Sequence, residues 1–319
     1  MVKQLMYLAG LAVALVLVSC ESTTDPADPQ PPVAPGAPTE LMATSINETT
    51  IRIQWAAADT GAAATGFIVV VEEEGSNNPQ ELPISNGATR VVNISQLTDG
   101  TVYDFTVYAL NDTARSTPSP TISWAPAGRF TADIRMYETE SSMGSGVQLP
   151  NNAGLTIGEG GSWDLALDTR GETFDIGSPG LSSYTDESTP PEFPNGEPAR
   201  ATLIGKVWTD VTSLDDIFES ADLSQETLEE KLLNFDQANG TGSQFAFVVR
   251  TTSGNYAKVL VKATDGKLLQ GTTPDRYIDL EVSYQSGANV PYALKQKVVV
   301  SKYTKKIDGV IDTNVKKNF

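Results

Sequence analysis

The 319-residue sequence contains no histidine and a single cysteine, Cys20. Without histidine, Ser-His-Asp and Cys-His catalysis are excluded, and the commonest zinc and copper ligand is missing. A single cysteine excludes any disulfide within the chain. The folded parts must therefore depend on apolar cores, and the length is sufficient for two ordinary domains.

Positive charge is also scarce, because 22 lysine and arginine residues face 40 acidic residues, for a net charge of -18. Nucleic-acid binding needs clustered lysine and arginine, so this balance argues against a nucleic-acid partner. The last residues, 295–319, differ, with seven lysines against Asp308 and Asp312. Two interpretations stay open for this segment: a basic element that docks internally or on an anionic partner or headgroup, and a solvated strand face with a frayed end.

Long apolar runs are missing too, and the uncharged run Leu5–Val18 is too short to cross a bilayer core of about 30 Å. It follows Lys3, and a lysine before a short apolar run is the pattern of a secretory signal. The run ends in Leu17-Val18-Ser19-Cys20, which resembles the lipobox of bacterial lipoproteins. The resemblance implies that residues 1–19 are a cleaved signal peptide and that Cys20 is acylated, with palmitate among the attached chains.

An acylated Cys20 predicts a protein anchored to a membrane without spanning it. In lipoproteins generally, the absence of aspartate directly after the cysteine favours the outer membrane, and Glu21 stands there. The periplasmic and the surface-facing side both stay open. Residues 20–37 are rich in proline and form a predicted extended linker that holds the rest of the chain away from the membrane, by up to about 50 Å at ~3.1 Å per residue.

Short alternating segments begin near residue 41 and predict β-strands. Residues 50–55 alternate with Ile51, Ile53 and Trp55 on one face, and residues 103–109 alternate in the same way. Residues 66–73 and 90–94 are further strands, and turn residues separate all four segments. This spacing predicts a β-sandwich of about 90 residues.

Motifs in the same region resemble the fibronectin type III family. They are Pro38-Thr39-x-Leu41-x-Ala43, Trp55, and the element from Leu97 through Thr98-Asp99-Gly100-Thr101-Val102 to Tyr103. The resemblance implies a fibronectin type III domain over residues 38–127, in which Trp55 and Leu97 are buried and the Tyr103 hydroxyl bonds backbone upstream. Asp99 departs from the family's usual proline. The chain has no Arg-Gly-Asp, so integrin-type adhesion is not implied, and such a module in a surface protein is a spacer or a binding platform.

Residues 129–319 predict a second, β-rich domain. The expected strands are 131–138, 162–167, 202–207, 244–251, 256–263, 277–285 and 295–303. Residues 168–198 are rich in glycine, proline and serine and predict long surface loops. Ser213 is a predicted N-cap, and Leu228, Leu232, Leu233 and Phe235 have helical spacing, so one or two short helices are expected. The predicted fold class is mostly β, a fibronectin type III sandwich plus a second antiparallel β-rich domain.

Short pieces of this second region resemble the HmuY-type haem-binding lipoproteins of Bacteroidetes. The pieces are Trp163-Asp164-Leu165, the hairpin Gln244–Ala263 and the strand Arg276–Gln285. The resemblance implies an all-β domain and haem binding. With histidine and cysteine excluded, Met136 and Met143 are the candidate axial ligands, with Tyr137 between them, although methionine in an apolar strand commonly fills a core.

Acidic residues supply the other candidate chemistry. Asp164, Asp168, Glu172 and Asp175 cluster in sequence and have the oxygen ligands that calcium prefers. No Asp-x-[Asp/Asn]-x-[Asp/Asn]-Gly loop occurs, and an acidic composition produces such clusters by itself. Asp164 and Glu172 would also be a carboxylate pair for glycoside hydrolysis. No nucleophile elbow or phosphate-binding loop occurs, so the chain is not expected to be an enzyme and no cofactor is predicted.

Three functional hypotheses follow from these patterns. The first is a lipid-anchored cell-envelope protein whose fibronectin module spaces a β domain that binds a protein or glycan, with Trp208, Tyr184 and Tyr277 as candidate contacts. The second is a haem or small-ligand scavenger of the HmuY type. The third, which is the least supported, is an accessory of carbohydrate-active hydrolases.

Overall fold

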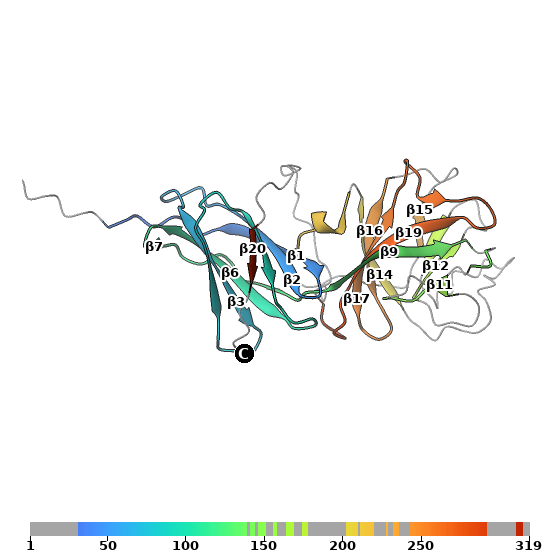
Figure 1. Ribbon diagram of the computed structural model, residues 1–319, viewed down its shortest axis with the longest axis horizontal. Helices are drawn as coiled ribbons and strands as arrows, with labels where there is room; N and C mark the ends of the chain where they lie inside the picture. Colours follow the sequence, from blue (N-terminus) through green and yellow to red (C-terminus); the bar gives the residue numbers. More distant parts are fainter. Residues whose placement is uncertain are drawn as a thin grey trace, which may run out of the picture.

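The computed structural model describes residues 31–138, 141–143, 146–150, 156–157, 164–168, 174–177, 202–209, 211–219, 228, 232–235, 243–291 and 311–314. Nearly all of the regular structure in these residues is β-strand, and most strands pair antiparallel, so the predicted fold class is confirmed. The described strands form two β-sandwiches, which lie end to end along the long axis of the molecule (Figure 1).

The first sandwich contains the residues with fibronectin-like motifs. One sheet has the order β1-β2-β5-β20, with bounds Thr39–Asn47, Thr50–Ala56, Val91–Ser95 and Ile311–Asn314. The other has β4 (Gln80–Ile84), β3 (Gly66–Glu73), β6 (Tyr103–Asn111) and β7 (Ala114–Arg115), with β8 (Ile122–Trp124) paired to β6. The C-terminal strand β20 therefore belongs to the sheet of the first sandwich.

Alternation along these strands makes the first core, as predicted. In β2 the residues Ile51, Ile53 and Trp55 are buried and their neighbours are half-buried, and β6 alternates in the same way from Tyr103. Trp55 packs edge-on against Phe67 of the facing sheet, with ring centroids 5.2 Å apart. Because side chains on a strand alternate between faces, this period of two places one apolar row from each sheet in the core.

The second sandwich also has two sheets. The larger has the order β14 (Leu203–Thr209), β16 (Phe245–Arg250), β17 (Tyr256–Lys262), β19 (Tyr277–Tyr284) and β18 (Leu269–Gln270), and β9 (Gly128–Tyr137) pairs with β19. The smaller has β11 (Thr156–Ile157), β10 (Gly146–Val147), β12 (Leu165–Asp168), β13 (Phe174–Gly177) and β15 (Leu232–Phe235). Their facing apolar residues, such as Phe247 and Leu165, form one core.

Two predictions in this region need correction. Leu232–Phe235 is not helical, because its backbone pairs with β13 in register Phe174 to Phe235. The same pairing places a strand at Phe174–Gly177, inside the expected loops 168–198. Short apolar runs fit helix and strand equally well, and the distant partner decides between them. A short 3-10 helix, η2 (Leu214–Asp216), does form with the predicted cap at Ser213. The predicted strand 295–303 lies outside the described residues.

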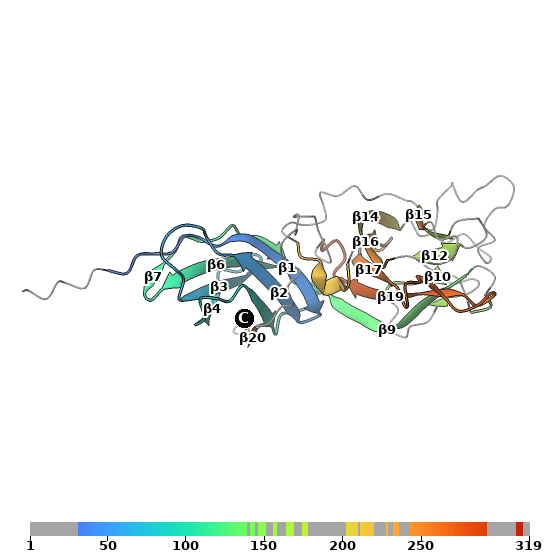
Figure 2. The ribbon, with the colours of Figure 1, turned by 90° about the horizontal axis from the view of Figure 1, so that it is seen from above.

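The two sandwiches meet through the end of β1, η2 and the start of β9. Figure 2 shows η2, the gold coil, between the two bodies. Ala43 of β1 and Glu219 exchange two backbone hydrogen bonds of 2.7 and 2.8 Å, and Gln285 Nε2 donates to the carbonyl of Pro126 at 3.0 Å. The described residues before β1 lie at the far end of the first sandwich (Figure 1). The first sandwich therefore separates the chain's N-terminal side from the second sandwich.

Candidate functional site

The outer face of the larger sheet in the second sandwich carries two of the aromatic residues that the sequence singled out. Trp208 of β14 pairs with Ala246 of β16. Ala246 pairs with Leu260 of β17, which pairs with Glu281 of β19. Tyr277 is four residues from Glu281 and so lies on the same face. Two strands separate Trp208 and Tyr277, so the two aromatic residues share a face without forming one cluster.

The end of this face nearest the first sandwich is covered. Val211, Leu214 and Ile217 pack there with Ala246, Val248, Tyr256 and Leu260 in a second apolar cluster. Trp208 packs against the edge of that cluster and is half-buried. It is therefore mainly a packing residue of the junction.

Lys258 lies at the centre of the junction and is completely buried. Its ammonium group donates long hydrogen bonds to Thr44 Oγ1 at 3.4 Å, the Leu214 carbonyl at 3.5 Å and the Ile217 carbonyl at 3.4 Å. Burial, and then the nearby charge of Arg129, lower the pKa of Lys258 to about 7. The signal in the sequence that could have found this site is a lysine, Lys258, inside an otherwise apolar strand.

Carboxylates around Lys258 oppose this shift. Glu219, Asp215 and Glu281 each raise the pKa of Lys258 by their negative charge. Asp215 also pairs with Arg129 and, at 3.5 Å, with Arg52 of the first sandwich. The junction thus holds a network of opposite charges, in which one buried lysine is about half protonated at pH 7.

The other end of the outer face carries a cluster that we call the tyrosine patch: Arg135, Tyr137, Lys262, Tyr277 and Asp279. Asp279 pairs with Lys262 on one side and with Arg135 on the other, and Tyr277 pairs with Tyr137. All five are half-buried, whereas the residues between them in sequence, such as Met136 and Ile278, face the core.

Within the tyrosine patch the side chains hold one another in place. The rings of Tyr137 and Tyr277 are 5.4 Å apart between centroids, and the Arg135 guanidinium lies 4.5 Å from the Tyr277 ring centroid. Arg135 Nε also donates to Asp279 Oδ1 at 3.2 Å. The hydrogen bond with Tyr137, despite partial burial, raises the pKa of Arg135 still further. The patch presents a fixed cation, two aromatic rings and an acid to solvent.

Tyr137 belongs to this cluster, although in the sequence it is notable only as a residue between two methionines. Its partnership with Tyr277 arises from the antiparallel pairing of β9 and β19 across 140 residues of chain. Tyr184, the remaining aromatic candidate, lies outside the described residues.

The two methionine candidates for haem ligation are not brought together. Met136 is completely buried in the second core, in register with Ile278. Met143 lies in a turn and is 55% exposed. Met136 therefore fills a packed core, and only Met143 is accessible to a large planar ligand.

The acidic candidates for calcium are only partly brought together. Asp164 is completely buried and accepts hydrogen bonds from the Leu149 amide at 2.8 Å and from Thr202 Oγ1 at 3.3 Å. Asp168 and Asp175 are paired residues on β12 and β13. Glu172 lies outside the described residues. Among the described residues no group of three acidic side chains is arranged to hold a metal ion.

The residues that marked the fibronectin resemblance behave as that resemblance implied. Trp55, Leu97 and Tyr103 are all buried in the first core. The Thr98 amide donates to the Tyr103 hydroxyl at 3.0 Å, which is the tyrosine corner expected for this turn. Cys20, the predicted lipid-attachment residue, lies outside the described residues.

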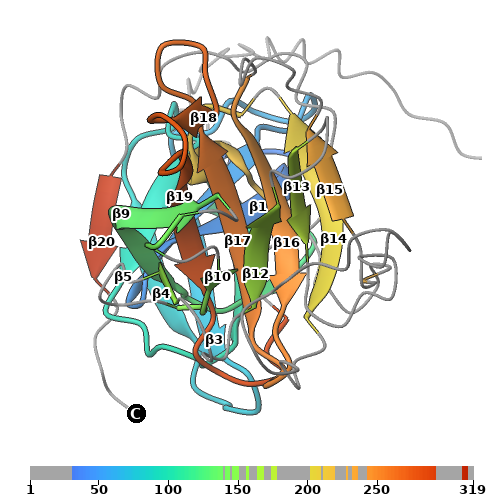
Figure 3. The same ribbon diagram turned by 90° about the vertical axis from the view of Figure 1, so that its right-hand side faces the viewer.

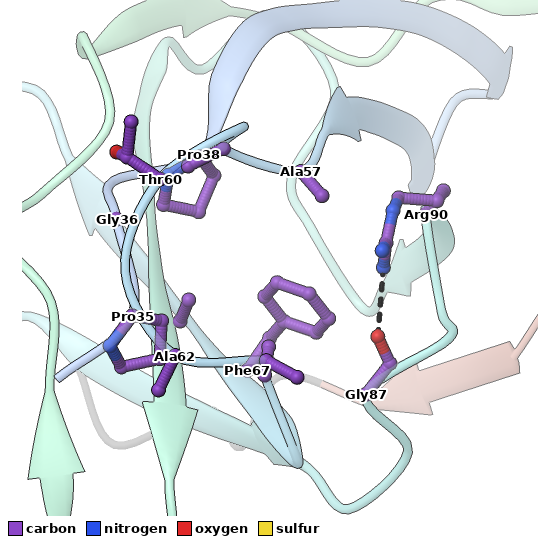
Figure 4. Close-up of a pocket in the computed structure, with 13 residues that line it drawn as sticks. Pro35, Gly36, Pro38, Ala57, Thr60, Ala62, Phe67, Gly87 and Arg90 are labelled. Carbon is purple, nitrogen blue, oxygen red and sulfur yellow. Dashed lines mark hydrogen bonds between the residues drawn. The ribbon is translucent and has the colours of Figure 1, made fainter. Parts of the chain in front are cut away.

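A cavity of about 200 Å³ opens in the first sandwich beside residues 35–38, which directly precede β1 (Figure 4). Phe67 forms its floor, and the Arg90 guanidinium lies 5.2 Å from that ring and donates to the Gly87 carbonyl at 2.9 Å. The other lining residues are mostly alanine, glycine and proline. Arg90 is the only charged residue in the lining, so this cavity has no acid–base pair for catalysis.

The match to a known family concerns the first sandwich. Residues 36–123 match the family model of the fibronectin type III domain. The chain thus contains a fibronectin type III domain. Similar solved structures include a myokine structure (18% identity, TM-score 0.27, 29% of this chain and 99% of that one) and the FN5 domain of Drosophila Lar (26%, 0.25, 30% and 98%). A computationally redesigned β-sandwich protein is another (16%, 0.25, 28% and 89%).

No curated protein matches the chain. The fibronectin match ends at residue 123, before the second sandwich begins, so it assigns no ligand to the tyrosine patch. Fibronectin type III domains are typically non-catalytic modules. Among the described residues, no helix has the length and apolarity that a membrane span requires.

Proposed function

We propose that the chain is a lipid-anchored cell-envelope binding protein of the outer membrane, in which the fibronectin domain spaces a β-rich recognition domain from the membrane. The lipobox-like sequence ending at Cys20 and the proline-rich linker behind it support the anchor. The end-to-end arrangement supports the spacing, because the described N-terminal residues and the second sandwich lie at opposite ends of the fibronectin domain (Figure 1). The proposed domain boundaries are residues 38–127 and 129–319, and strand β20 of the second segment pairs back onto the first sandwich.

The tyrosine patch is the proposed contact surface, and the observation that carries the proposal is the clustering of Tyr137, Tyr277 and Arg135, all half-buried, on the outer face of the larger sheet. Tyrosine and arginine are enriched where protein interfaces concentrate their binding energy. Arg135 already covers one face of the Tyr277 ring, which leaves less aromatic surface for stacking on a sugar. We therefore favour a protein partner over a glycan.

The first sandwich offers a matched control for the test. There Arg115 lies 3.6 Å from the ring centroid of Tyr108 and pairs with Glu81 at 2.8 Å, so the same chemistry occurs on a different surface. The full mature chain and its Tyr277→Ala and Arg135→Ala variants are used to capture envelope proteins by crosslinking. The proposal expects a captured protein that is lost with both variants and kept with Tyr108→Ala and Arg115→Ala.

A second arm separates the two partner classes. The same four variants and the parent chain are applied to an array of envelope glycans. Binding to a glycan that depends on Tyr277 and Arg135, without a captured protein, would replace the protein partner by a glycan. Capture that is equally sensitive to Arg115→Ala would refute the tyrosine patch as the contact surface.

A further inference from the structure

The strand β5 is an edge strand of the fibronectin domain as far as residues 38–127 are concerned. Within that region the strand paired with β5 is β2, and the register runs from Gln54 opposite Val91 to Ile51 opposite Ile94. An uncovered edge strand exposes unpaired backbone amide and carbonyl groups, and such an edge attracts other strands. In this chain a segment from the far end of the sequence, β20, covers that edge.

The pairing of β20 with β5 is parallel and in continuous register. Ile311 is opposite Val92, and the register continues to Asn314 opposite Ser95. Figures 1 and 2 both show β20 within the fibronectin sandwich and away from the second sandwich, and Figure 3, which looks along the long axis, shows β20 next to β5. The chain therefore returns across the junction to complete a sheet that it left more than 200 residues earlier.

The register places chemically suitable positions side by side. Positions 311 and 313 are in register with Val92 and Ile94, which are buried in the first core. Position 312 continues a row formed by Arg52 and Asn93, in which Arg52 Nε donates to Asn93 Oδ1 at 2.9 Å. Position 312 therefore belongs to the row that alternates with the core-facing positions of β5. The register thus matches Ile311 and Thr313 to the core positions of β5, and Asp312 to the position between them.

We propose that the exposed edge of β5 is a strand-binding site for a short extended peptide, and that its resident ligand is the chain's own segment 311–314. Backbone pairing supplies the affinity, and the alternating side-chain positions supply the selectivity, as in other strand-addition sites. Four paired residues give a weak contact by themselves. Residues 292–310 tether the ligand, and a tether of this kind gives an effective concentration in the millimolar range.

The consequence is a sheet edge that the molecule closes for itself. Docking of residues 311–314 covers the outer backbone groups of β5, and it prevents β5 from pairing with another copy. This inference is independent of the tyrosine patch, which lies on the second sandwich.

The first test uses the scarcity of cysteine in this chain. In the Cys20→Ser background, cysteines are placed at the paired positions by Asn93→Cys and Asp312→Cys. The control pair is Thr106→Cys and Asp312→Cys, because Thr106 lies on the opposite sheet and is half-buried on its outer face. We expect an intramolecular disulfide to form at least tenfold faster between positions 93 and 312 than between positions 106 and 312. Equal rates, or disulfides that join two molecules, would overturn the proposal.

The second test separates the site from its tether. A chain that ends at Asp308 is mixed with a labelled peptide of residues 307–319, and binding is followed by fluorescence anisotropy. The proposal expects saturable binding to the shortened chain and at least tenfold weaker binding to the full chain, whose edge is occupied. A peptide with Thr313→Pro should bind neither, because proline removes a backbone donor. Equal binding by the two peptides would overturn the proposal.

Discussion

Lys258 of the second sandwich donates a hydrogen bond to the hydroxyl of Thr44 in the first, over 3.4 Å. The two residues are 214 positions apart, and both are completely buried. A buried ammonium group with long hydrogen bonds is poorly solvated, so the junction favours its neutral form. The contact between the two sandwiches is therefore also the place where the chain's stability depends on protonation.

The free energy of unfolding should rise between about pH 7 and pH 10, because Lys258 loses its proton at a lower pH in the folded chain than in the unfolded chain. The pKa of this lysine is about 7 in the folded chain and about 10.4 in an unfolded one. Between these values the unfolded chain holds a proton that the folded chain has released, so the free energy of unfolding increases with pH, by about 1 kcal/mol per pH unit. Below pH 7 both states are protonated and this contribution is constant.

Urea unfolding at several pH values between 6 and 10 measures this slope. Lys258→Met should flatten it, whatever the variant does to stability at any single pH. Lys262→Met is the matched control, because Lys262 lies on the same strand but is half-exposed. A slope in the Lys258→Met variant as steep as in the parent chain would show that other groups produce it.

Tyr103→Phe should destabilise the fibronectin domain by about 1–2 kcal/mol. The substitution removes the acceptor of the Thr98 amide in a turn where Tyr103 is 1% exposed. Chemical denaturation followed by tryptophan fluorescence measures the change. Tyr108→Phe, on the half-exposed face of the same strand, should change the free energy of unfolding by less than about 0.5 kcal/mol. Equal effects of the two substitutions would contradict a tyrosine corner.

Met136→Ala should cost about 2–5 kcal/mol, because it opens a cavity in the second core, whereas Met143→Ala should be nearly neutral. Thermal unfolding of the two variants measures the difference. A haem titration of the same proteins adds a separate readout, and we expect no Soret change that depends on Met136. A stable Met136→Ala variant that has lost a haem spectrum present in the parent would reverse this interpretation and support a scavenging function.

Asp164→Asn should destabilise the second sandwich by about 1–3 kcal/mol, since it weakens two hydrogen bonds to a buried carboxylate. The loss should be the same in calcium and in a chelator, because the bonds go to protein groups. Asp265→Asn, in an exposed turn, is the control and should leave the stability of the second sandwich unchanged. A parent chain whose melting temperature rises with calcium, through Asp164, would restore the calcium hypothesis.

Cys20→Ser should release the protein from the membrane into the soluble fraction. Acyl chains on the cysteine are the proposed anchor, and one acyl chain alone binds only marginally, so the unmodified chain should not be retained. Metabolic labelling with palmitate, followed by fractionation, measures both modification and location. Ser19→Thr is a control near the same site that keeps the cysteine. Retention of an unlabelled Cys20→Ser protein in the membrane fraction would contradict the lipid anchor.

The sequence alone was sufficient for the fibronectin domain. Its alternating strands, Trp55 and the turn leading to Tyr103 are local patterns, and a period of two with turn residues between strands permits few other structures. The longer strands of the second sandwich, β16, β17 and β19, were predictable for the same reason. Leu232–Phe235 was not, because its neighbours in sequence fit a helix and only pairing with β13 makes it a strand.

The tertiary structure decided everything that depends on distant partners. Tyr137 and Tyr277 become neighbours through β9 and β19, and Asp164 becomes a structural group because it is buried beside Leu149. Lys258 acquires its lowered pKa only where the two sandwiches meet. Composition can show that a lysine or a carboxylate is present. Its solvation and its charged neighbours, which set what it does, are properties of the folded chain.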